Sequence, residues 1–262
     1  MLIVADNLTL SNPIILKKIR EKDKDFFYSF FEKCGELSDY IDINLGQIKR
    51  DIKEIIKFIF EIMYEVDNFN VVIDTVNRDS IIECLKYCKK PPILNSFSKD
   101  DKKFREILPI AVENNLEVVA LVMDNQIPVS IEDKIVLATE IVNIFLDAGI
   151  NTDKIILDPI VSPLGWDNGG ILNKNNLEFL TMVKEAISPE IRTMMGFSNL
   201  TTGSTGKSRA IKKLDSLYMA MAFSKGVDFA LINVLDVNIQ NCINFIKIIE
   251  ENLIFSPSVF NE

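Results

Sequence analysis

Eight short apolar segments, most of them rich in β-branched residues, recur along the chain, and longer stretches with the apolar spacing of helices separate them. Short apolar strands that alternate with helices are typical of a parallel sheet buried on both faces. The predicted strands are Leu2–Ala5, Tyr40–Ile43, Asn70–Ile73, Pro92–Leu94, Val118–Met123, Ile155–Leu157, Thr193–Met195 and Phe229–Ile232. This alternation places the chain in the α/β class.

The segments between the strands are predicted helices. They cover residues 23–34, 48–66, 79–88, 101–114, 131–148, 175–187, 208–225 and 238–253. Glycine follows two of them, at Gly149 and Gly226, as expected at helix C-termini. An α/β barrel commonly uses about 250 residues as one domain. The chain has 262 residues and no Pro/Gly/Ser-rich linker. We therefore predict a (β/α)8 TIM barrel, as a single domain over residues 1–262, rather than an open doubly wound sheet.

The sequence contains no histidine. Histidine is the usual general base near neutral pH and the commonest transition-metal ligand. Its absence rules out Ser-His-Asp and Cys-His catalysis, HExxH zinc hydrolysis and the zinc deaminase site. Chemistry must therefore use carboxylates, amides, hydroxyls or groups of the substrate, and we expect no metal site in this chain.

The formal net charge is −9. A chain of this charge does not attract phosphate backbones or an anionic membrane leaflet, so we expect neither nucleic acid nor membrane as a partner. The four cysteines form no CxxC pair, and no secretory leader is recognisable. Both observations favour reduced thiols and a cytoplasmic location.

Asp or Asn follows almost every predicted strand. The strand ends carry Asp6-Asn7, Asn44, Asp74, Asn95, Asp124, Asp158, Ser198-Asn199 and Asn233. In a parallel barrel these ends meet at one mouth, where active sites lie. Each residue alone is explained better by the preference of Asp and Asn for turns and helix N-caps. The whole ring, however, offers acceptors and amides suited to a flat ligand with many N–H donors and ring nitrogens, such as a pterin.

Five segments stand in order at successive strand ends: Asp42-Ile-Asn-Leu-Gly46, Ile73-Asp-Thr-Val-Asn77, Ile93-Leu-Asn-Ser96, Leu157-Asp-Pro-Ile160 and Gly196-Phe-Ser-Asn-Leu200. Together they resemble the pterin-binding methyltransferases, which include the methyltetrahydrofolate:corrinoid/iron-sulfur protein methyltransferases, the folate domain of cobalamin-dependent methionine synthase and, more remotely, dihydropteroate synthase. The resemblance spans almost the whole chain. It implies an enzyme of one-carbon metabolism that moves the N5-methyl group between methyltetrahydrofolate and the cobalt of a separate corrinoid protein.

The resemblance also implies a set of site residues, namely Asp74, Asn95, Asp158, Gly196, Ser198, Asn199 and Arg209. In the family's pattern, Asp74, Asn95 and Asp158 hydrogen-bond the amino-pyrimidinone edge of the pterin. Asn199 then lies next to N5, the atom that carries the methyl group, and Arg209 is the arginine of the following loop. The family further suggests a homodimer.

Methyl transfer from N5 requires a proton on that nitrogen, in the ground or transition state, because a neutral tertiary amine is a poor leaving group. The Asn199 amide cannot supply this proton but can orient or stabilise N5–H, while the proton comes from water or a carboxylate network. Cobalamin is expected only through the partner corrinoid protein, because this chain has no histidine to ligate cobalt and no room for a second domain.

Two other interpretations stay open within a pterin-binding barrel. A dihydropteroate synthase-like enzyme would need basic groups for a pyrophosphate leaving group, and the Ser198-Asn199 pair favours methyl transfer instead. A non-catalytic pterin-binding subunit of a methyltransferase complex would bind methyltetrahydrofolate without turnover. The loop of residues 162–170, which contains Trp166, is expected to be either a lid or docking surface or an ordinary surface loop.

The segment Thr201-Thr-Gly-Ser-Thr-Gly-Lys-Ser208 imitates a phosphate-binding P-loop. It falls short of GxxxxGK[ST], because the first glycine of that motif would stand at Thr201. Lys207 and Arg209 could still meet an anionic part of the ligand, such as the glutamate of folate.

Overall fold

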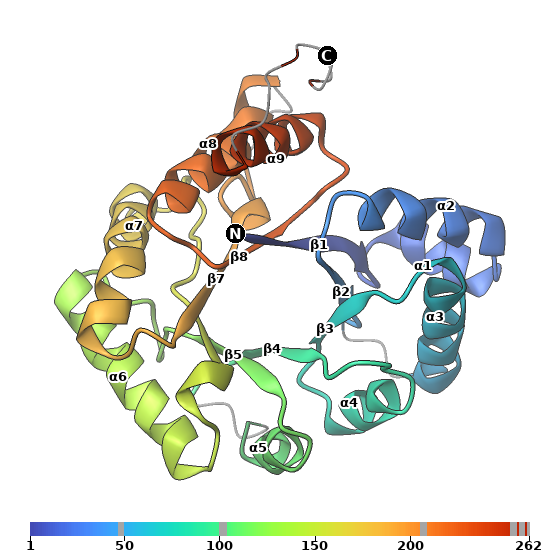
Figure 1. Cartoon of the computed structure of the whole chain (residues 1–262), viewed down its shortest axis with the longest axis horizontal. Helices are drawn as coiled ribbons and strands as arrows, with labels where there is room; N and C mark the ends of the chain where they lie inside the picture. Colours follow the sequence, from blue (N-terminus) through green and yellow to red (C-terminus); the bar gives the residue numbers. More distant parts are fainter. Residues whose placement is uncertain (47–49, 100–103, 205–208, 252–255, 257–259, 261–262) are drawn as a thin grey trace.

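A computed structural model describes residues 1–46, 50–99, 104–204, 209–251, 256 and 260, and its eight parallel strands close into a barrel in chain order (Figure 1). The strands are β1 (Leu2–Thr9), β2 (Tyr40–Asn44), β3 (Asn70–Asp74), β4 (Ile93–Phe97), β5 (Glu117–Leu121), β6 (Ile155–Asp158), β7 (Arg192–Gly196) and β8 (Phe229–Ile232). The predicted (β/α)8 barrel is confirmed. The main differences in strand bounds are that β1 extends beyond Ala5 to Thr9, that β4 extends beyond Leu94 and that β5 stops before Met123.

Helices surround the barrel (Figure 1). They are α1 (Pro13–Arg20), α2 (Lys24–Gly35), α3 (Ile52–Val66), α4 (Arg78–Leu85), α5 (Phe104–Glu113), α6 (Ile131–Asp147), α7 (Gly169–Ala186), α8 (Arg209–Ser224) and α9 (Val237–Glu250). The sequence prediction lacks α1, although its start is marked by Asn12, whose Oδ1 accepts from the Ile14 amide at 2.9 Å, and by Pro13. Helix α7 begins at Gly169 rather than at residue 175, and the sequence prediction missed this start because buried Asn173 interrupts the apolar pattern of the first turns.

Seven buried apolar side chains fill the barrel, each from a different strand. They are Val4, Val72, Ile93, Val119, Ile156, Met194 and Phe229, and we call them the apolar plug. At the N-terminal ends of the strands, the Arg192 guanidinium pairs with Glu117 at 3.1 Å and lies 5.5 Å from the centre of the Phe229 ring. The barrel is therefore packed below its middle, and the opposite end, where the strands finish, is left for a ligand.

Strand β1 contains an irregularity next to this open end. Ala5 pairs with Ile41 and Leu8 with Ile43, so β1 has one more residue than β2 over this stretch. A β-bulge of this kind bends a strand and redirects its side chains. Here it lies at Asp6 and Asn7, which bond to partners just beyond the ends of β7 and β8, as described below.

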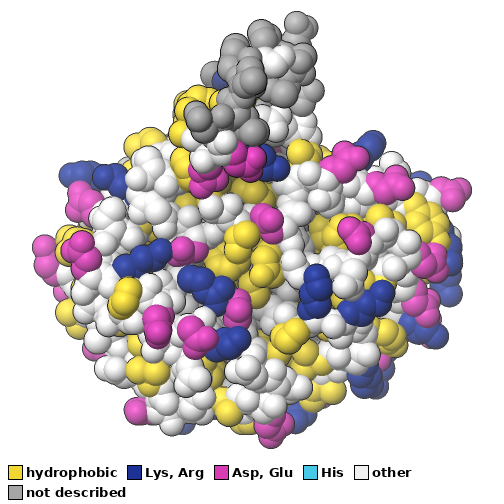
Figure 2. All heavy atoms as spheres, in the orientation of Figure 1, with side chains coloured by type: hydrophobic (Ala, Val, Ile, Leu, Met, Phe, Trp, Pro, Cys, Tyr) yellow, Lys and Arg dark blue, Asp and Glu magenta, His cyan; other side chains and the backbone are white. Residues whose placement is uncertain are grey.

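Acidic and basic side chains are interspersed over the face shown in Figure 2. Within the described ranges, no helix combines the length and the apolar character that crossing a membrane would require.

Candidate functional site

A layer of mostly polar side chains, which we call the polar layer, lies directly above the apolar plug, at the C-terminal ends of the strands. Side chains alternate between the two faces of a strand, so the residues two positions beyond the plug also face the barrel axis. They are Asp6, Asp74, Asn95, Leu121, Asp158, Gly196 and Leu231. Asn44, Asp74 and Asn95 are direct register partners across β2, β3 and β4. The structure thus brings together the predicted residues Asp74, Asn95 and Asp158 at one mouth.

The carboxylates on the β2–β4 side are coupled to amides. Asn44 Nδ2 donates to Asp74 Oδ2. The side chain of Asn95 favours the charged form of the Asp42 carboxyl, which lies one layer deeper and whose Oδ1 is buried without a hydrogen-bond partner among the described residues. Burial raises the pKa of Asp74 to about 6. Burial, reinforced by the charges of Asp74 and Asp6, raises the pKa of Asp42 well above its usual range. Its surroundings therefore favour the neutral form of Asp42, while Asp74 can change its charge when a donor approaches.

The end of β6 is held by a buried lysine. Lys134, on α6, is fully buried, and its Nζ donates to the Pro159 carbonyl at 3.1 Å and to Asn176 Oδ1. Burial lowers the pKa of Lys134 to about 8, and burial raises that of Asp158 to about 6. The hydrogen bond from the Ile160 amide (2.8 Å) and the positive charge of Lys134 act against the rise at Asp158.

Ile160 has a left-handed backbone with φ of +67°, which is rare for a β-branched residue. Its amide donates to Asp158, and its carbonyl accepts from Asn176 Nδ2 at 2.8 Å. A conformation of this kind costs about 1–3 kcal/mol and persists only where its surroundings hold it. Residues in such conformations cluster at functional sites, and this one lies immediately beyond Asp158.

The β7 end carries Gly196, Ser198 and Asn199. The last two belong to a short 3-10 helix, Phe197–Asn199. Ser198 Oγ donates to Asp6 Oδ2 at 2.7 Å, which connects the ends of β7 and β1. Burial raises the pKa of Asp6, and the bond from Ser198 lowers it. Asn199 is exposed, and a Cβ atom at Gly196 would lie 3.3 Å from its Nδ2. The glycine therefore leaves room for the Asn199 amide to lie over the strand end.

Some predicted ring residues have structural roles. Asn7 Nδ2 donates to Asn233 Oδ1 at 2.6 Å, and Asn7 Oδ1 accepts from the Val234 amide at 3.1 Å, so these two asparagines bind each other and the backbone. Asp124 lies beyond the end of β5, and its carboxylate pairs with Lys99 at 3.1 Å. It is therefore not part of the polar layer.

An alternative explanation of the Asp and Asn residues at the strand ends is that they cap helices, and the observed N-caps test it. The N-cap side chains that bond a backbone amide are Asn12, Asp23, Asn77, Ser130 and Asp236. None of them belongs to the ring. Asn44, Asp158 and Asn233 do accept from amides two residues on, at 3.0, 2.8 and 3.0 Å. Turn formation therefore uses the single side-chain oxygen of each asparagine and one of the two oxygens of Asp158.

Two predicted features can be only partly placed. Arg209 is the first residue of α8, but its side chain lies outside the described part of the structure, and Lys207 is not among the described residues.

Trp166, in the loop after β6, is 56% exposed. It lines a pocket of about 670 Å³ between the connections that follow β5 and β6, together with Ile127 and Leu172. More than half of the Trp166 side chain is thus accessible to a ligand or a partner.

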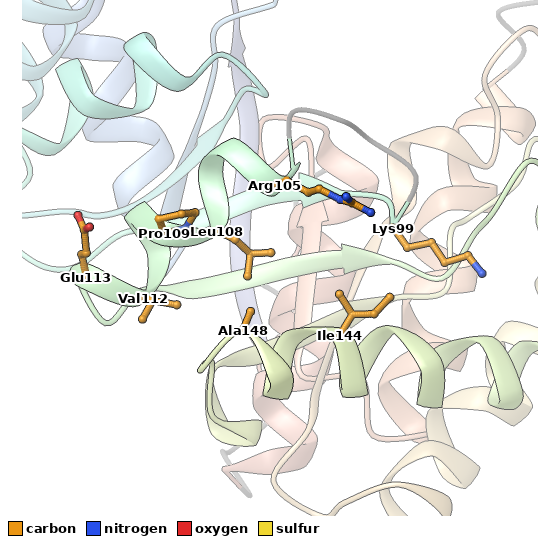
Figure 3. A pocket seen from close by; sticks show the side chains of 8 residues that line it. All are labelled: Lys99, Arg105, Leu108, Pro109, Val112, Glu113, Ile144 and Ala148. Atoms are coloured by element: carbon orange, nitrogen blue, oxygen red, sulfur yellow. The ribbon is translucent and has the colours of Figure 1, made fainter.

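An apolar cavity on the outer wall is distinct from the mouth. It has a volume of about 580 Å³, and Leu108, Val112, Ile144 and Ala148 of α5 and α6 and the loop after α6 face one another across it (Figure 3). It contains none of the polar-layer residues, so it is not the candidate site.

Comparison with known proteins decides the family. The pattern described as "Pterin binding enzyme" matches residues 41–233. The chain belongs to the pterin-binding enzymes. The match runs from β2 to the residue after β8 and so covers the polar layer except for the end of β1. A methylcorrinoid:tetrahydrofolate methyltransferase from Eubacterium limosum is 27% identical over 238 residues, 89% of this chain and 85% of the relative.

Solved structures of dihydropteroate synthases share the fold of this pterin-binding enzyme. The Thermus thermophilus enzyme has a TM-score of 0.63 and 18% identity over 97% of this chain and 94% of its own. The Yersinia pestis enzyme, solved with a pterine-sulfa conjugate, has a TM-score of 0.69 and 15% identity over 96% and 94%. At these identities the likeness establishes the barrel and not the reaction.

Lys134 is not among the site residues predicted from the sequence. Its signal was present, because a lysine shares the helical spacing of buried Leu137, Ala138 and Ile141, but lysines at such positions usually extend to solvent. Only the fold shows that the ammonium group of this pterin-binding enzyme reaches the Pro159 carbonyl.

We expect the substitution Lys134→Met to lower the free energy of unfolding by about 1–3 kcal/mol, because the Pro159 carbonyl and Asn176 Oδ1 lose their buried donor. Urea denaturation followed by circular dichroism measures the change. Lys174→Met, on the exposed face of α7, is the matched control and should stay within about 0.5 kcal/mol of wild type. Equal stability of both variants would show that the lysine does not hold the end of β6.

Proposed function

We propose that this pterin-binding enzyme moves the N5-methyl group between methyltetrahydrofolate and the cobalt of a separate corrinoid protein. The observation that carries the proposal is the layer of acceptors on β3, β4 and β6 at the same mouth as the exposed Asn199 amide, which lies in the 3-10 helix after β7. The relative from Eubacterium limosum, named for transfer between a methylcorrinoid and tetrahydrofolate, supports the same chemistry.

Pterin recognition follows from the charges of the polar layer. The amino-pyrimidinone edge of a reduced pterin carries neighbouring N–H donors, which suit ionised carboxylates. Burial raises the pKa values of Asp74 and Asp158 to about 6, so both are mainly ionised at neutral pH. Little solvent reaches these carboxylates to stabilise their negative charge. Asn95 provides an amide that can donate or accept. These three residues are proposed to hold the ring.

The preorganisation of Asp158 favours a fixed orientation of the ring. Lys134, Asn176 and the left-handed Ile160 fix the β6 end before any ligand arrives. A site held by buried hydrogen bonds presents its acceptors without the cost of reorganisation when the ligand binds. The pterin is therefore proposed to be placed with N5 toward β7.

Asn199 is proposed to act at N5. Its amide can accept from a protonated N5, which stabilises the form of the substrate that loses its methyl group. It is not an acid, so the proton comes from water or from a carboxylate. Asp6, bonded to Ser198 next to Asn199, is the nearest carboxyl along the chain of contacts described above. The corrinoid protein supplies the cobalt as the second substrate.

The test of the reaction is to mix the protein with methyltetrahydrofolate and cob(I)alamin and to follow methylcobalamin by absorbance. Turnover supports the proposal. Binding of methyltetrahydrofolate without turnover to free or protein-bound cob(I)alamin would favour a non-catalytic pterin-binding subunit. Condensation of a pterin pyrophosphate with p-aminobenzoate would identify a dihydropteroate synthase-like enzyme instead.

We expect Asn199→Ala to lower kcat for methyl transfer by about 10²–10³-fold, the usual cost of losing one polar group that stabilises a transition state. Stopped-flow absorbance measures the rate. Asn151→Ala, at an exposed asparagine before β6 and at the opposite end of the barrel, is the control and should leave kcat unchanged. If both variants react at the wild-type rate, Asn199 does not act at N5.

Tetrahydrofolate affinity should rise with pH. A carboxyl with a pKa of about 6 must lose its proton before it can accept two N–H groups, so each such group makes binding about tenfold weaker at about pH 5 than at about pH 7. Isothermal titration calorimetry gives the dissociation constants. The variant Asp158→Asn should bind more weakly at neutral pH and show a smaller dependence on pH, whereas an unchanged pH profile would remove Asp158 from the contact with the ring.

A further inference from the structure

A groove leaves the mouth at the end of β1. It has a volume of about 650 Å³, within the range of ligand pockets. Its inner end is lined by Asp6, Asn7 and Asn233, and its outer part by residues of α2 that include Phe26, Phe30 and Lys33. The groove is therefore continuous with the polar layer at one end and ends on the outside of the barrel at the other.

The α2 residues of this groove form a single face. Phe26, Phe30 and Lys33 have the spacing of one helical stripe, and seven residues of helix span about 10 Å. The rings of Phe26 and Phe30 lie nearly parallel, with 21° between their planes and 6.1 Å between their centres. Along α2 the groove thus presents an aromatic wall first and a cation at its far end.

Lys33 is the cation available to a ligand in this region. Lys18 pairs with Asp23 at 2.6 Å, and Lys24 lies 4.0 Å from Glu65. Lys33 is exposed and, among the described residues, has no ion-pair partner. In a chain with a net charge of −9, an uncompensated ammonium group beside an apolar wall suits an anionic aromatic group.

The orientation proposed for the pterin determines where the rest of folate lies. The pyrimidinone edge faces β3, β4 and β6, and N5 faces β7. The side chain of folate is attached to C6, which is bonded to N5 and lies opposite that edge. In the closed barrel β8 follows β7 and adjoins β1. The substituent on C6 therefore leaves the mouth on the side where the groove begins.

We propose that this groove binds the aminobenzoyl-glutamate tail of the folate substrate, an inference that rests on the proposed methyl transfer. The secondary amine at the start of the tail faces the acceptors of Asp6 and Asn7. The benzoyl ring packs on Phe26 and Phe30, and the glutamate carboxylates pair with Lys33. Residues of α2 thereby distinguish a folate from a pterin without a tail.

The test compares two substrates, methyltetrahydrofolate and a tail-less N5-methyl tetrahydropterin with only a methyl group at C6. In wild type the tail-less compound should have the higher KM, with a similar kcat. The variants Lys33→Gln and Lys33→Glu should raise KM for methyltetrahydrofolate by about two- to fivefold and about tenfold, in that order. Neither should change KM for the tail-less compound. Lys225→Glu, at an exposed lysine after α8, is the control of equal charge change.

Binding measured by calorimetry with tetrahydrofolate and the corresponding tail-less tetrahydropterin provides a readout that does not depend on turnover. Phe26→Leu, which removes the ring but keeps an apolar side chain, should weaken the binding of tetrahydrofolate and leave the binding of the tail-less tetrahydropterin unchanged. If the Lys33 variants bind and use both compounds like wild type, the tail lies elsewhere, for example toward Arg209, and the proposal is wrong. If neither compound binds wild type, the proposed function itself fails, and the groove proposal falls with it.

Discussion

The apolar plug is the constraint on which the site depends. By filling the barrel beneath the strand ends, Val72, Ile156 and their partners exclude water from one side of the polar layer. The carboxyls above it therefore lose hydration, and at Asp158 the charge of Lys134 offsets only part of that loss. This loss of hydration is the physical origin of the raised pKa values of Asp74 and Asp158. A ligand that brings N–H groups replaces the missing solvent, so selectivity for such a ligand is built into the packing below it.

Much of this arrangement could be predicted from the sequence. The strands of a parallel barrel are buried on both faces, so they appear as short apolar segments, and the residue after each segment indicates the mouth. The polar layer was visible for the same reason at Asp74, Asn95 and Asp158. What could not be predicted depends on side-chain reach between distant elements. The contact of Lys134 with the β6 end is one case, and the bond between Ser198 and Asp6 is another. Neither pair is close in sequence, and no local pattern encodes it.

The predicted start of α7 was wrong because polar residues are buried there. Asn173 lies outside the predicted helix 175–187 but inside α7, and both Asn173 and Asn176 satisfy backbone groups in the interior. Their amides serve Ser162 and Ile160, so the same residues that obscure the helix also fix the loop after β6. The end of β1 was hard to interpret for a different reason. Its bulge changes which side chains face inward, and the shared family pattern begins only at β2.

The separation between helix caps and the polar layer has a consequence for how this fold changes over evolutionary time. Asn12, Asp23, Asn77, Ser130 and Asp236 begin helices, while the side chains that face the barrel axis begin none. A mutation in the polar layer therefore alters chemistry without removing a helix start, and a mutation at a cap such as Ser130 weakens the scaffold without changing the polar layer. Residues that hold the fold and residues that face the ligand can thus change independently in evolution. This is consistent with a barrel shared with dihydropteroate synthases at 15–18% identity.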